Sequence, residues 1–269
     1  MPEFSLSGGE AGLQPARSVS LLQRLRPLVG LALFAFLFLI WSVTAKLLPE
    51  KHLYLFPAPW TTARALWSAL PELLLSTYYS FLVLIPGYLA AVILGAFSGL
   101  LVGSSRWLRE IFTPFARVAA PVPPTVYVPY AIALLPSFRS SAIAIVLAAA
   151  FWPIFLNSVA GALAVPEGHR DNARVLALSH FEYLRLVALP AALPFIFNGM
   201  HVSLGLSFIM LTVAELFGAS YGLGRFVQYY ADFADYPRMV AGILYTGFVT
   251  FLSMTFLGQL EKKIIFWPH

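Results

Sequence analysis

The sequence contains no cysteine and few charged residues, and both absences narrow what the protein can be. Without cysteine the chain can form no disulfide, no thiolate metal site and no cysteine nucleophile. Charged residues make up 11% of the chain, against roughly 25% in soluble domains. Hydrophobic residues make up 59%, and the mean hydropathy is +0.80. This composition is typical of an integral membrane protein.

Three further sequence features are absent: a clustered basic surface, a signal peptide and a phosphate-binding loop. The net charge is +5, but the basic residues are scattered singly, so we expect no nucleic-acid binding. Residues 1–27 lack the apolar core and cleavage site of a signal peptide. We expect them to form a flexible cytosolic arm that precedes a retained membrane span. The sequence has no G-x-x-x-x-G-K-[ST] phosphate loop, so this chain is not predicted to bind ATP itself.

The sequence does contain a series of long apolar segments. A run of about 20 such residues is enough to cross a bilayer. We therefore predict an all-α membrane protein with one transmembrane domain at residues 28–263 and a short tail at residues 264–269. Its six expected transmembrane helices lie at about 28–45, 73–102, 114–135, 141–163, 195–214 and 239–257.

Two short helices are expected outside these spans. Residues 59–69 are predicted to form a separate helix on the far membrane surface. Within residues 216–238, four aromatic residues follow helical spacing and predict a short amphipathic helix: Phe226, Tyr229, Tyr230 and Phe233.

Small residues recur every four positions in two of the spans. The longer series is Gly87, Ala91, Gly95, Gly99 and Gly103. Gly199, Ser203 and Ser207 repeat the pattern in the fifth span. Such a face allows another helix to approach closely, because packing drives helix association in lipid. Both series predict packing seams, although glycine is also simply frequent in transmembrane helices.

The third span is interrupted by prolines at positions 121, 123, 124 and 129, which a regular helix does not accommodate. Irregular backbone at membrane depth is tolerated only inside protein or along a water-filled path. Pro123, Pro124 and Tyr127 are therefore candidates for lining a pathway. A kinked helix end at the membrane surface is the alternative.

Polar residues within the fifth span are further pathway candidates, namely His201, Ser207 and Glu215. A structural role is the alternative for each. His201 and Glu215 are 14 residues apart, about 21 Å along a helix, which argues against an intramembrane enzyme. An ion-coupled secondary transporter would have paired intramembrane carboxylates or an internal repeat, and neither is visible. No catalytic or metal site is predicted, because His169 and His180 lack partners at metal-ligand spacing.

A charged segment, which we call the elbow (residues 166–194), separates the fourth and fifth spans. Ser179 and Glu182 have the spacing of a helix capping box, and Pro190 is expected to end the helix that they begin. The elbow is thus predicted to contain two short helices joined by a turn. Lys and Arg are more frequent on its side of the predicted topology, so the elbow and both termini are expected to be cytosolic.

The elbow resembles the signature of permeases in binding-protein-dependent ABC importers, which reads EAA, three residues, G, nine residues, I-x-L-P. Asp171-Asn172-Ala173 stands at the EAA position, Ala177 replaces the glycine, and Val187-Ala188-Leu189-Pro190 matches I-x-L-P. The resemblance covers residues 28–263 and is strongest from 166 to 226. There it is closest to the nitrate, sulfonate, taurine and bicarbonate branch. Because alanine disfavours the left-handed conformation open to glycine, we expect a slightly different turn at Ala177.

The resemblance implies a permease of the type I importer fold that works as a pair, in a bacterial inner membrane. A cytosolic ATPase, which would bind ATP and Mg, would grip the elbow through residues 166–190, and a periplasmic or surface binding protein would deliver a small solute. The permease itself would need no cofactor. The residues implied in ATPase docking are Asp171, Asn172, Ala173, Ala177, Leu178, His180, Phe181, Tyr183, Leu189 and Pro190.

Overall fold

The computed structural model describes residues 21–47 and 55–266, which fall into two units that we treat separately. The first unit holds α1 (Leu21–Leu47), which is apolar from Ala32 onward. In this unit the Trp41 indole donates a hydrogen bond to the Pro57 carbonyl, at 3.1 Å. Most of the predicted N-terminal arm and the end of the C-terminal tail lie outside the described residues.

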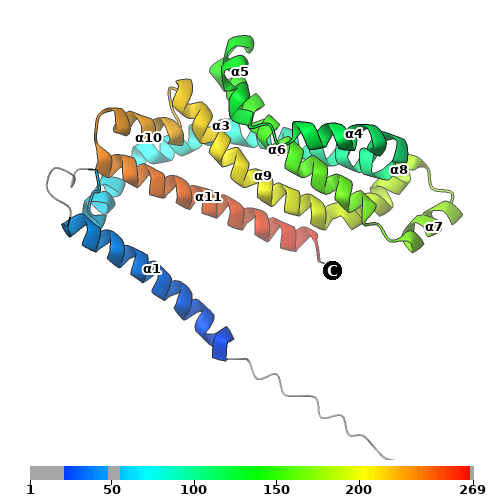
Figure 1. Ribbon diagram of the computed structural model, residues 1–269, viewed down its shortest axis with the longest axis horizontal. Coiled ribbons are helices and arrows are strands. Elements are labelled where there is room, and N and C mark those ends of the chain that lie inside the picture. The colour runs from blue at the N-terminus through cyan, green and yellow to red at the C-terminus, as the bar shows by residue number, and fades with distance from the viewer. Residues whose placement is uncertain (1–20, 48–54, 267–269) are drawn as a thin grey trace, which may run out of the picture. The chain divides into compact units, whose positions relative to one another are not determined.

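Four long helices run alongside one another in the second unit (Figure 1). They are α3 (Pro59–Ser104), α6 (Phe138–Leu163), α9 (Leu189–Gly218) and α11 (Tyr236–Ile264). Within the described residues, these four are long and apolar enough to cross a membrane, α9 together with the turns that precede it from His180. The all-helical class is confirmed. The six-span topology stays a prediction, because the other two apolar helices are shorter, at Ala32–Leu47 and Pro124–Leu134.

The separate surface helix predicted at residues 59–69 does not exist, because α3 runs without interruption from Pro59 through Pro71 and Pro86. A proline within a helix removes one backbone hydrogen bond. Burial on both sides of Pro71 offsets that loss, since Ala69 is 4% exposed and Leu73 is fully buried.

The proline-interrupted third span is broken, as predicted. α4 (Arg106–Ala119) is followed by a short 3₁₀ turn, η1 (Pro124–Tyr127), and by α5 (Val128–Leu134). α4 begins eight residues before the predicted span. The Ser105 side chain caps it by accepting from the Leu108 amide, and Arg106 pairs with Glu110 at 2.9 Å.

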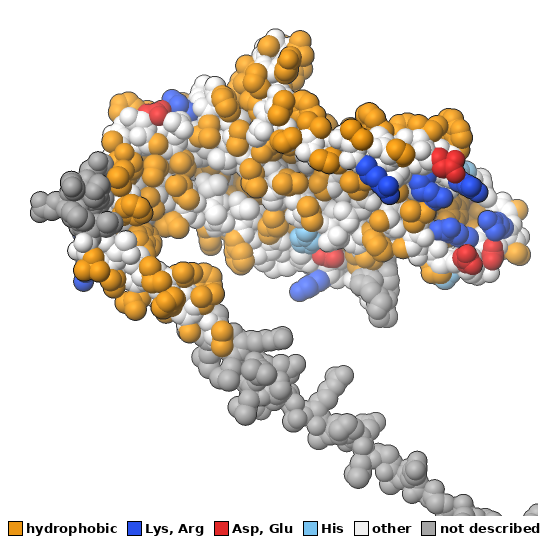
Figure 2. Space-filling model, viewed as in Figure 1, with side chains coloured by type: hydrophobic (Ala, Val, Ile, Leu, Met, Phe, Trp, Pro, Cys, Tyr) orange, Lys and Arg blue, Asp and Glu red, His pale blue; other side chains and the backbone are white. Residues whose placement is uncertain are grey.

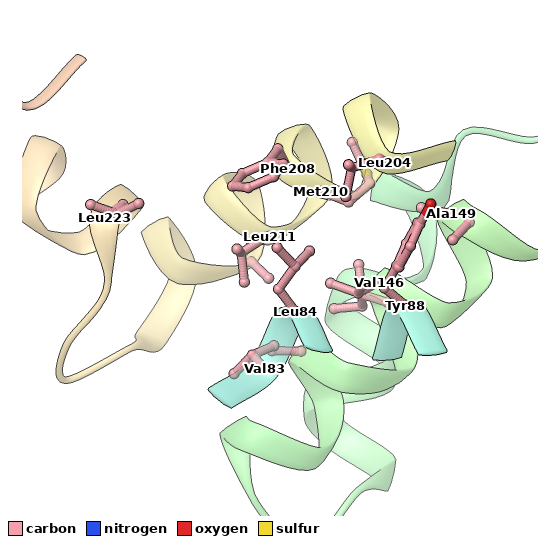
Figure 3. Packing of buried hydrophobic residues seen from close by; sticks show 14 of the residues in the cluster. Val83, Leu84, Tyr88, Val146, Ala149, Leu204, Phe208, Met210, Leu211 and Leu223 are labelled. Atoms are coloured by element: carbon pink, nitrogen blue, oxygen red, sulfur yellow. The ribbon is translucent and has the colours of Figure 1, made fainter. Parts of the chain in front are cut away.

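The predicted packing seams are confirmed. The small residues of α3 lie against α6 so closely that a Cβ atom on Gly99 would lie 2.5 Å from the Ser158 Cβ. On α9, a Cβ atom on Gly199 would lie 2.9 Å from the Pro153 carbonyl oxygen of α6. The core formed between these helices is shown in Figure 3, where side chains of α3, α6 and α9 converge.

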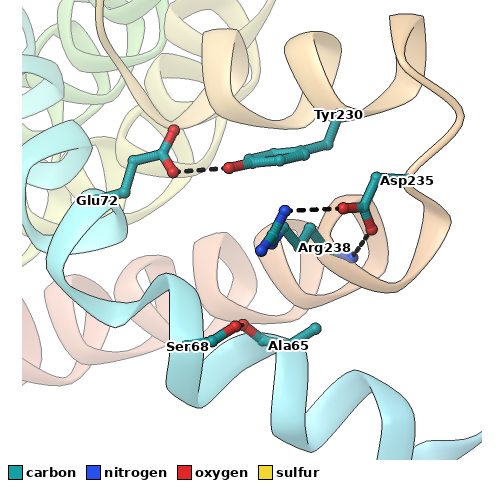
Figure 4. Close-up of polar contacts among 6 residues, drawn as sticks. All are labelled: Ala65, Ser68, Glu72, Tyr230, Asp235 and Arg238. Atoms are coloured by element: carbon teal, nitrogen blue, oxygen red, sulfur yellow. Dashed lines mark hydrogen bonds and ion pairs between the residues drawn. The ribbon is translucent and has the colours of Figure 1, made fainter.

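The predicted amphipathic helix is also confirmed, as α10 (Leu223–Asp232). The Tyr230 hydroxyl donates to the Glu72 carboxylate at 2.8 Å, and Arg238 pairs with Asp235 at 3.0 Å (Figure 4). Burial, and then the bond to Glu72, raise the pKa of Tyr230 to about 12. The hydroxyl therefore stays a donor at neutral pH, and it fixes α10 to α3.

Candidate functional site

The elbow contains two short helices joined by a turn, as predicted. They are α7 (Glu167–Val175) and α8 (His180–Tyr183), and α8 leads into a π-helical turn, η2 (Leu184–Ala188). Charged side chains gather at this end of the second unit, while hydrophobic side chains cover most of the rest of the visible face (Figure 2).

The turn after α7 is left-handed in spite of the alanine. Ala177 has φ of 49°, which corrects the expectation that alanine would avoid this conformation. The Leu178 amide donates to the Ala173 carbonyl, and the Ala177 amide donates to the Arg174 carbonyl. This pair of bonds forms a Schellman motif. The two bonds satisfy carbonyls at the end of α7, which offsets the cost of placing a Cβ in the left-handed region.

The predicted capping box at the start of α8 is confirmed. The Glu182 carboxylate accepts from the Ser179 amide at 2.8 Å, and the Ser179 hydroxyl accepts from the Glu182 amide at 3.4 Å. Two backbone donors that would otherwise be free at a helix start are satisfied in this way. The box sets where α8 begins without help from residues distant in sequence.

Pro190 does not end the helix that Ser179 begins, so that prediction is wrong. The chain passes from α8 through the π-turn directly into α9. The Leu189 amide donates to the Leu184 carbonyl, five residues back. Pro190 then lies in the first turn of α9 and has no N–H to donate, and the π-turn directly before it re-spaces the backbone within the continuous helix.

The side chain of Arg170 and apolar packing attach the elbow to the spans. Arg170 donates to the carbonyls of Ala162 and Leu163, at 3.2 and 2.9 Å. A cation is favourable there because carbonyls without helical partners end α6. Ala173 of α7 and Leu184 of the π-turn η2 are buried, so the elbow is anchored through α7 and through the turn that follows α8.

The predicted docking residues surround α7 and mostly face solvent. A groove of about 410 Å³ runs on one side of α7. Asn172, Ala173, Leu178 and Pro190 line it. Phe181 is 66% exposed, whereas Ala173 is buried. The structure thus brings four of the ten predicted docking residues to one open, partly apolar groove, while His180 and Tyr183 line a neighbouring cavity.

Sequence reasoning missed three apolar side chains on this surface. Val175 is 85% exposed, Leu176 is 70% exposed and Leu186 is 61% exposed. Leu176 and Leu186 also line the groove. Their position in the sequence could have indicated a contact surface, because bulky apolar residues beside a polar helix seldom face water without a partner.

The predicted pathway residues do not converge on one site. Pro123 and Tyr127 lie on the exposed surface, and Pro124 is half-buried. Ser207 is fully buried and donates to the Ser203 carbonyl. The His201 Nε2 atom lies 2.9 Å from a carboxylate oxygen of Glu261. This contact favours a structural role for His201 over a place in the pathway.

Glu215 is 2% exposed, and its carboxylate accepts two hydrogen bonds. The Ser80 hydroxyl donates to its carboxylate at 2.5 Å, and the Gly224 amide donates at 2.7 Å. The Ser80 oxygen in turn accepts from the Leu223 amide at 2.9 Å. We call Ser80, Glu215, Leu223 and Gly224 the clasp. Its contacts favour a structural role for Glu215, joining α3, α9 and α10.

The family of the chain follows from comparison with known proteins. Residues 91–266 match the family described as "Binding-protein-dependent transport system inner membrane component". The chain belongs to this family. The match includes the elbow, the clasp residues Glu215 and Gly224, and the whole of α11.

Curated relatives carry the names of several transport systems. The chain is 32% identical over 179 residues to the nitrate import permease protein NrtB of Synechocystis sp., covering 66% of this chain and 65% of the relative's length. It is 29% identical over 250 residues to the bicarbonate transport system permease protein CmpB of Synechococcus elongatus, covering 90% and 89%. It is 32% identical over 178 residues to the taurine transport system permease protein TauC of Escherichia coli, covering 66% and 65%.

Solved structures support the fold. One chain of the MetNI methionine ABC transporter, in an inward-facing conformation, matches 81% of this chain and 99% of its own length, with a TM-score of 0.53 at 17% identity. An amino acid ABC transporter matches 73% and 96%, with a TM-score of 0.55 at 17% identity. At this identity the likeness concerns the fold alone.

Proposed function

We propose that this protein is the transmembrane permease subunit of an ATP-driven importer, in which the elbow is the surface that a cytosolic ATPase grips. The observation that carries the proposal is the elbow itself. It combines exposed apolar side chains, an adjoining groove and two locally capped helices within a chain of this family. An enzyme or an ion-coupled transporter would not need such a surface.

The remaining parts of the assembly follow from this role. Two permease copies in the bacterial inner membrane would form the pathway for a small solute, with six spans per copy and both termini in the cytosol. A periplasmic or surface binding protein would deliver the solute. ATP and Mg would bind only in the ATPase. The relatives' names point to nitrate, bicarbonate or taurine as solutes to test first.

Energy would reach the spans through the continuous helix that begins at α8. A force on the elbow acts on α9 directly, because no loop separates the two. Moving a two-state equilibrium from 1:99 to 99:1 takes about 5.5 kcal/mol, which is within the reach of ATP hydrolysis.

Co-purification with the ATPase tests the docking role. We expect Asp171→Ala combined with Phe181→Ala to reduce the ATPase recovered with the tagged permease by at least about tenfold, because burying one large apolar side chain contributes roughly 1.5–3 kcal/mol. Recovery at the wild-type level would contradict the proposal.

The matched control uses the same residue types at the opposite end of the unit. Asp232→Ala combined with Phe233→Ala removes a carboxylate and a phenyl ring that is 70% exposed, compared with 66% for Phe181. This variant should retain the ATPase fully. If both double variants lose the ATPase equally, the loss reflects general destabilisation and the elbow has no special role.

A further inference from the structure

A second cavity beside the elbow is strongly basic. It has a volume of about 450 Å³ and lies where α3 and α6 end and α4 begins, beside α7 and α8. Its titratable lining consists of four arginines, one histidine and one tyrosine, and no carboxylate of the described chain contributes to it: Arg106, Arg109, Arg170, Arg174, His180 and Tyr183.

Two of the four arginines have no carboxylate partner in the described chain. Arg106 pairs with Glu110, and Arg174 pairs with Asp171. Arg109 donates only to the Gly103 carbonyl, and Arg170 donates only to the two carbonyls that end α6. Carbonyls orient a guanidinium but do not neutralise its charge, so the cavity has uncompensated positive charge that an anion would stabilise.

Two buried polar atoms in the lining residues also lack partners. Within the described chain, the Ser104 hydroxyl and the Arg170 Nε atom are buried without a hydrogen bond. A buried donor without an acceptor costs about 1–3 kcal/mol. Both residues line the cavity, so an anion bound there would lie beside these groups. Arginine in particular matches the geometry of phosphate.

The surroundings of the cavity indicate where such an anion would come from. Trp107 and Phe115 on α4 are 68% and 61% exposed, and Leu163 at the end of α6 is also exposed. This apolar surface adjoins the basic end of the second unit (Figure 2). Basic pockets at the ends of transmembrane helices bind anionic lipid headgroups, and tryptophan is common at the same level.

We propose that this cavity binds the phosphate of an anionic phospholipid, with the acyl chains along the apolar face of α4. Arg106 and Arg109 lie on α4, whereas Arg170 and Arg174 lie on α7. A phosphate between the two pairs therefore braces the elbow against the spans. The site goes beyond the importer proposal, and lipid binding to the permease alone requires only that the chain spans a bilayer. Four predicted docking residues also line the cavity, namely Ala173, Leu178, His180 and Tyr183, so binding is measured both without and with the ATPase.

Native mass spectrometry of the permease, alone and assembled with its ATPase, tests the site with phosphatidylglycerol as the probe. The wild type should retain one phosphatidylglycerol per chain and discriminate against phosphatidylcholine. Arg106→Gln combined with Arg109→Gln should weaken phosphatidylglycerol binding by roughly 25-fold, about fivefold for each arginine. Arg106→Gln alone removes only an exposed pair with Glu110, so the fold should be retained, and it should weaken binding about fivefold.

The matched control is Lys262→Gln combined with Lys263→Gln, which removes the same charge at the end of α11 and should leave binding unchanged. Phosphatidylglycerol binding by the Arg106/Arg109 variant at the wild-type level would overturn the proposal. Inorganic phosphate that displaces the lipid at equal concentration would identify a free oxyanion site and also overturn it. Lipid expelled when the ATPase is added would assign the cavity to an acidic group of the ATPase.

Discussion

The elbow and the clasp lie at opposite ends of the second unit, and they differ in the sequence range of the hydrogen bonds that stabilise them. In the elbow, the bonds are local: Ser179 with Glu182, Leu178 with Ala173, and Arg174 with Asp171. In the clasp, two of the three bonds join residues far apart in sequence: Ser80 with Glu215, and Leu223 with Ser80. The elbow is largely exposed, whereas the Glu215 side chain is buried.

The two ends should therefore respond differently to force. A segment held by local caps keeps its shape while it moves as a unit, which suits a surface that a partner grips. A network of buried long-range bonds fixes α3, α9 and α10 to one another and opposes relative motion. We expect changes in the clasp to lower global stability and changes in the elbow to act locally.

The largest effect is expected at Gly224 of the clasp. A Cβ atom there would lie 2.5 Å from the Thr212 carbonyl oxygen. Gly224→Val should therefore destabilise the solubilised protein by about 3 kcal/mol or more, measured by thermal unfolding in detergent. Gly247→Val on α11 is the control, because no atom lies within 4 Å of its added Cβ. Equal stability of the two variants would contradict the tight packing of the clasp.

The next largest loss of stability is expected from Glu215→Gln. The amide keeps the size of the carboxylate but offers one acceptor oxygen to two donors, Ser80 and Gly224. A buried donor left without an acceptor costs about 1–3 kcal/mol, and we expect a loss of that size in the free energy of unfolding. Glu72→Gln should cost less than about 1 kcal/mol, because its oxygen can still accept from the Tyr230 hydroxyl. Should Glu215→Gln unfold like the wild type, the clasp would not be a major constraint.

A smaller and local effect is expected from Ser179→Ala. Loss of a helix cap costs about 1 kcal/mol, and here it should increase protease cleavage within the elbow without moving the global transition. Ser179→Thr, which retains the capping hydroxyl, should restore resistance. A global shift in the unfolding temperature would show that the elbow is not an independent local unit.

The smallest effect is a gain in stability at Ala177. Its left-handed conformation is strained for alanine by about 1–2 kcal/mol, partly offset by the greater freedom of unfolded glycine. Ala177→Gly should therefore stabilise the elbow by about 0.5–1 kcal/mol, read as slower proteolysis. Ala173→Gly, within α7, should instead destabilise the elbow and accelerate its proteolysis. If Ala177→Gly accelerates cleavage, the Schellman turn does not govern the elbow.

Local features of the sequence predicted local features of the structure. The spacing of Ser179 and Glu182 indicated the capping box, and small residues at every fourth position indicated the seam between α3 and α6. The break in the third span followed from its prolines. Each of these depends on neighbours in sequence or on a short repeat.

Features that depend on distant residues could not be predicted in the same way. The bond between Ser80 and Glu215 joins positions 135 residues apart, so the sequence left Glu215 open between pathway and structure. The stop expected at Pro190 failed because a π-turn re-spaced the backbone before it. Ala177 kept a glycine-like turn because two hydrogen bonds at the end of α7 favour it.

Hydrogen–deuterium exchange of the permease with and without its ATPase tests the central claim most directly. The claim predicts that amides of residues 167–183 exchange at least about tenfold more slowly in the complex, while the Leu223 and Gly224 amides, already bonded in the clasp, remain unchanged. Unchanged exchange of the elbow in an intact complex, or new protection at the clasp instead, would contradict the account.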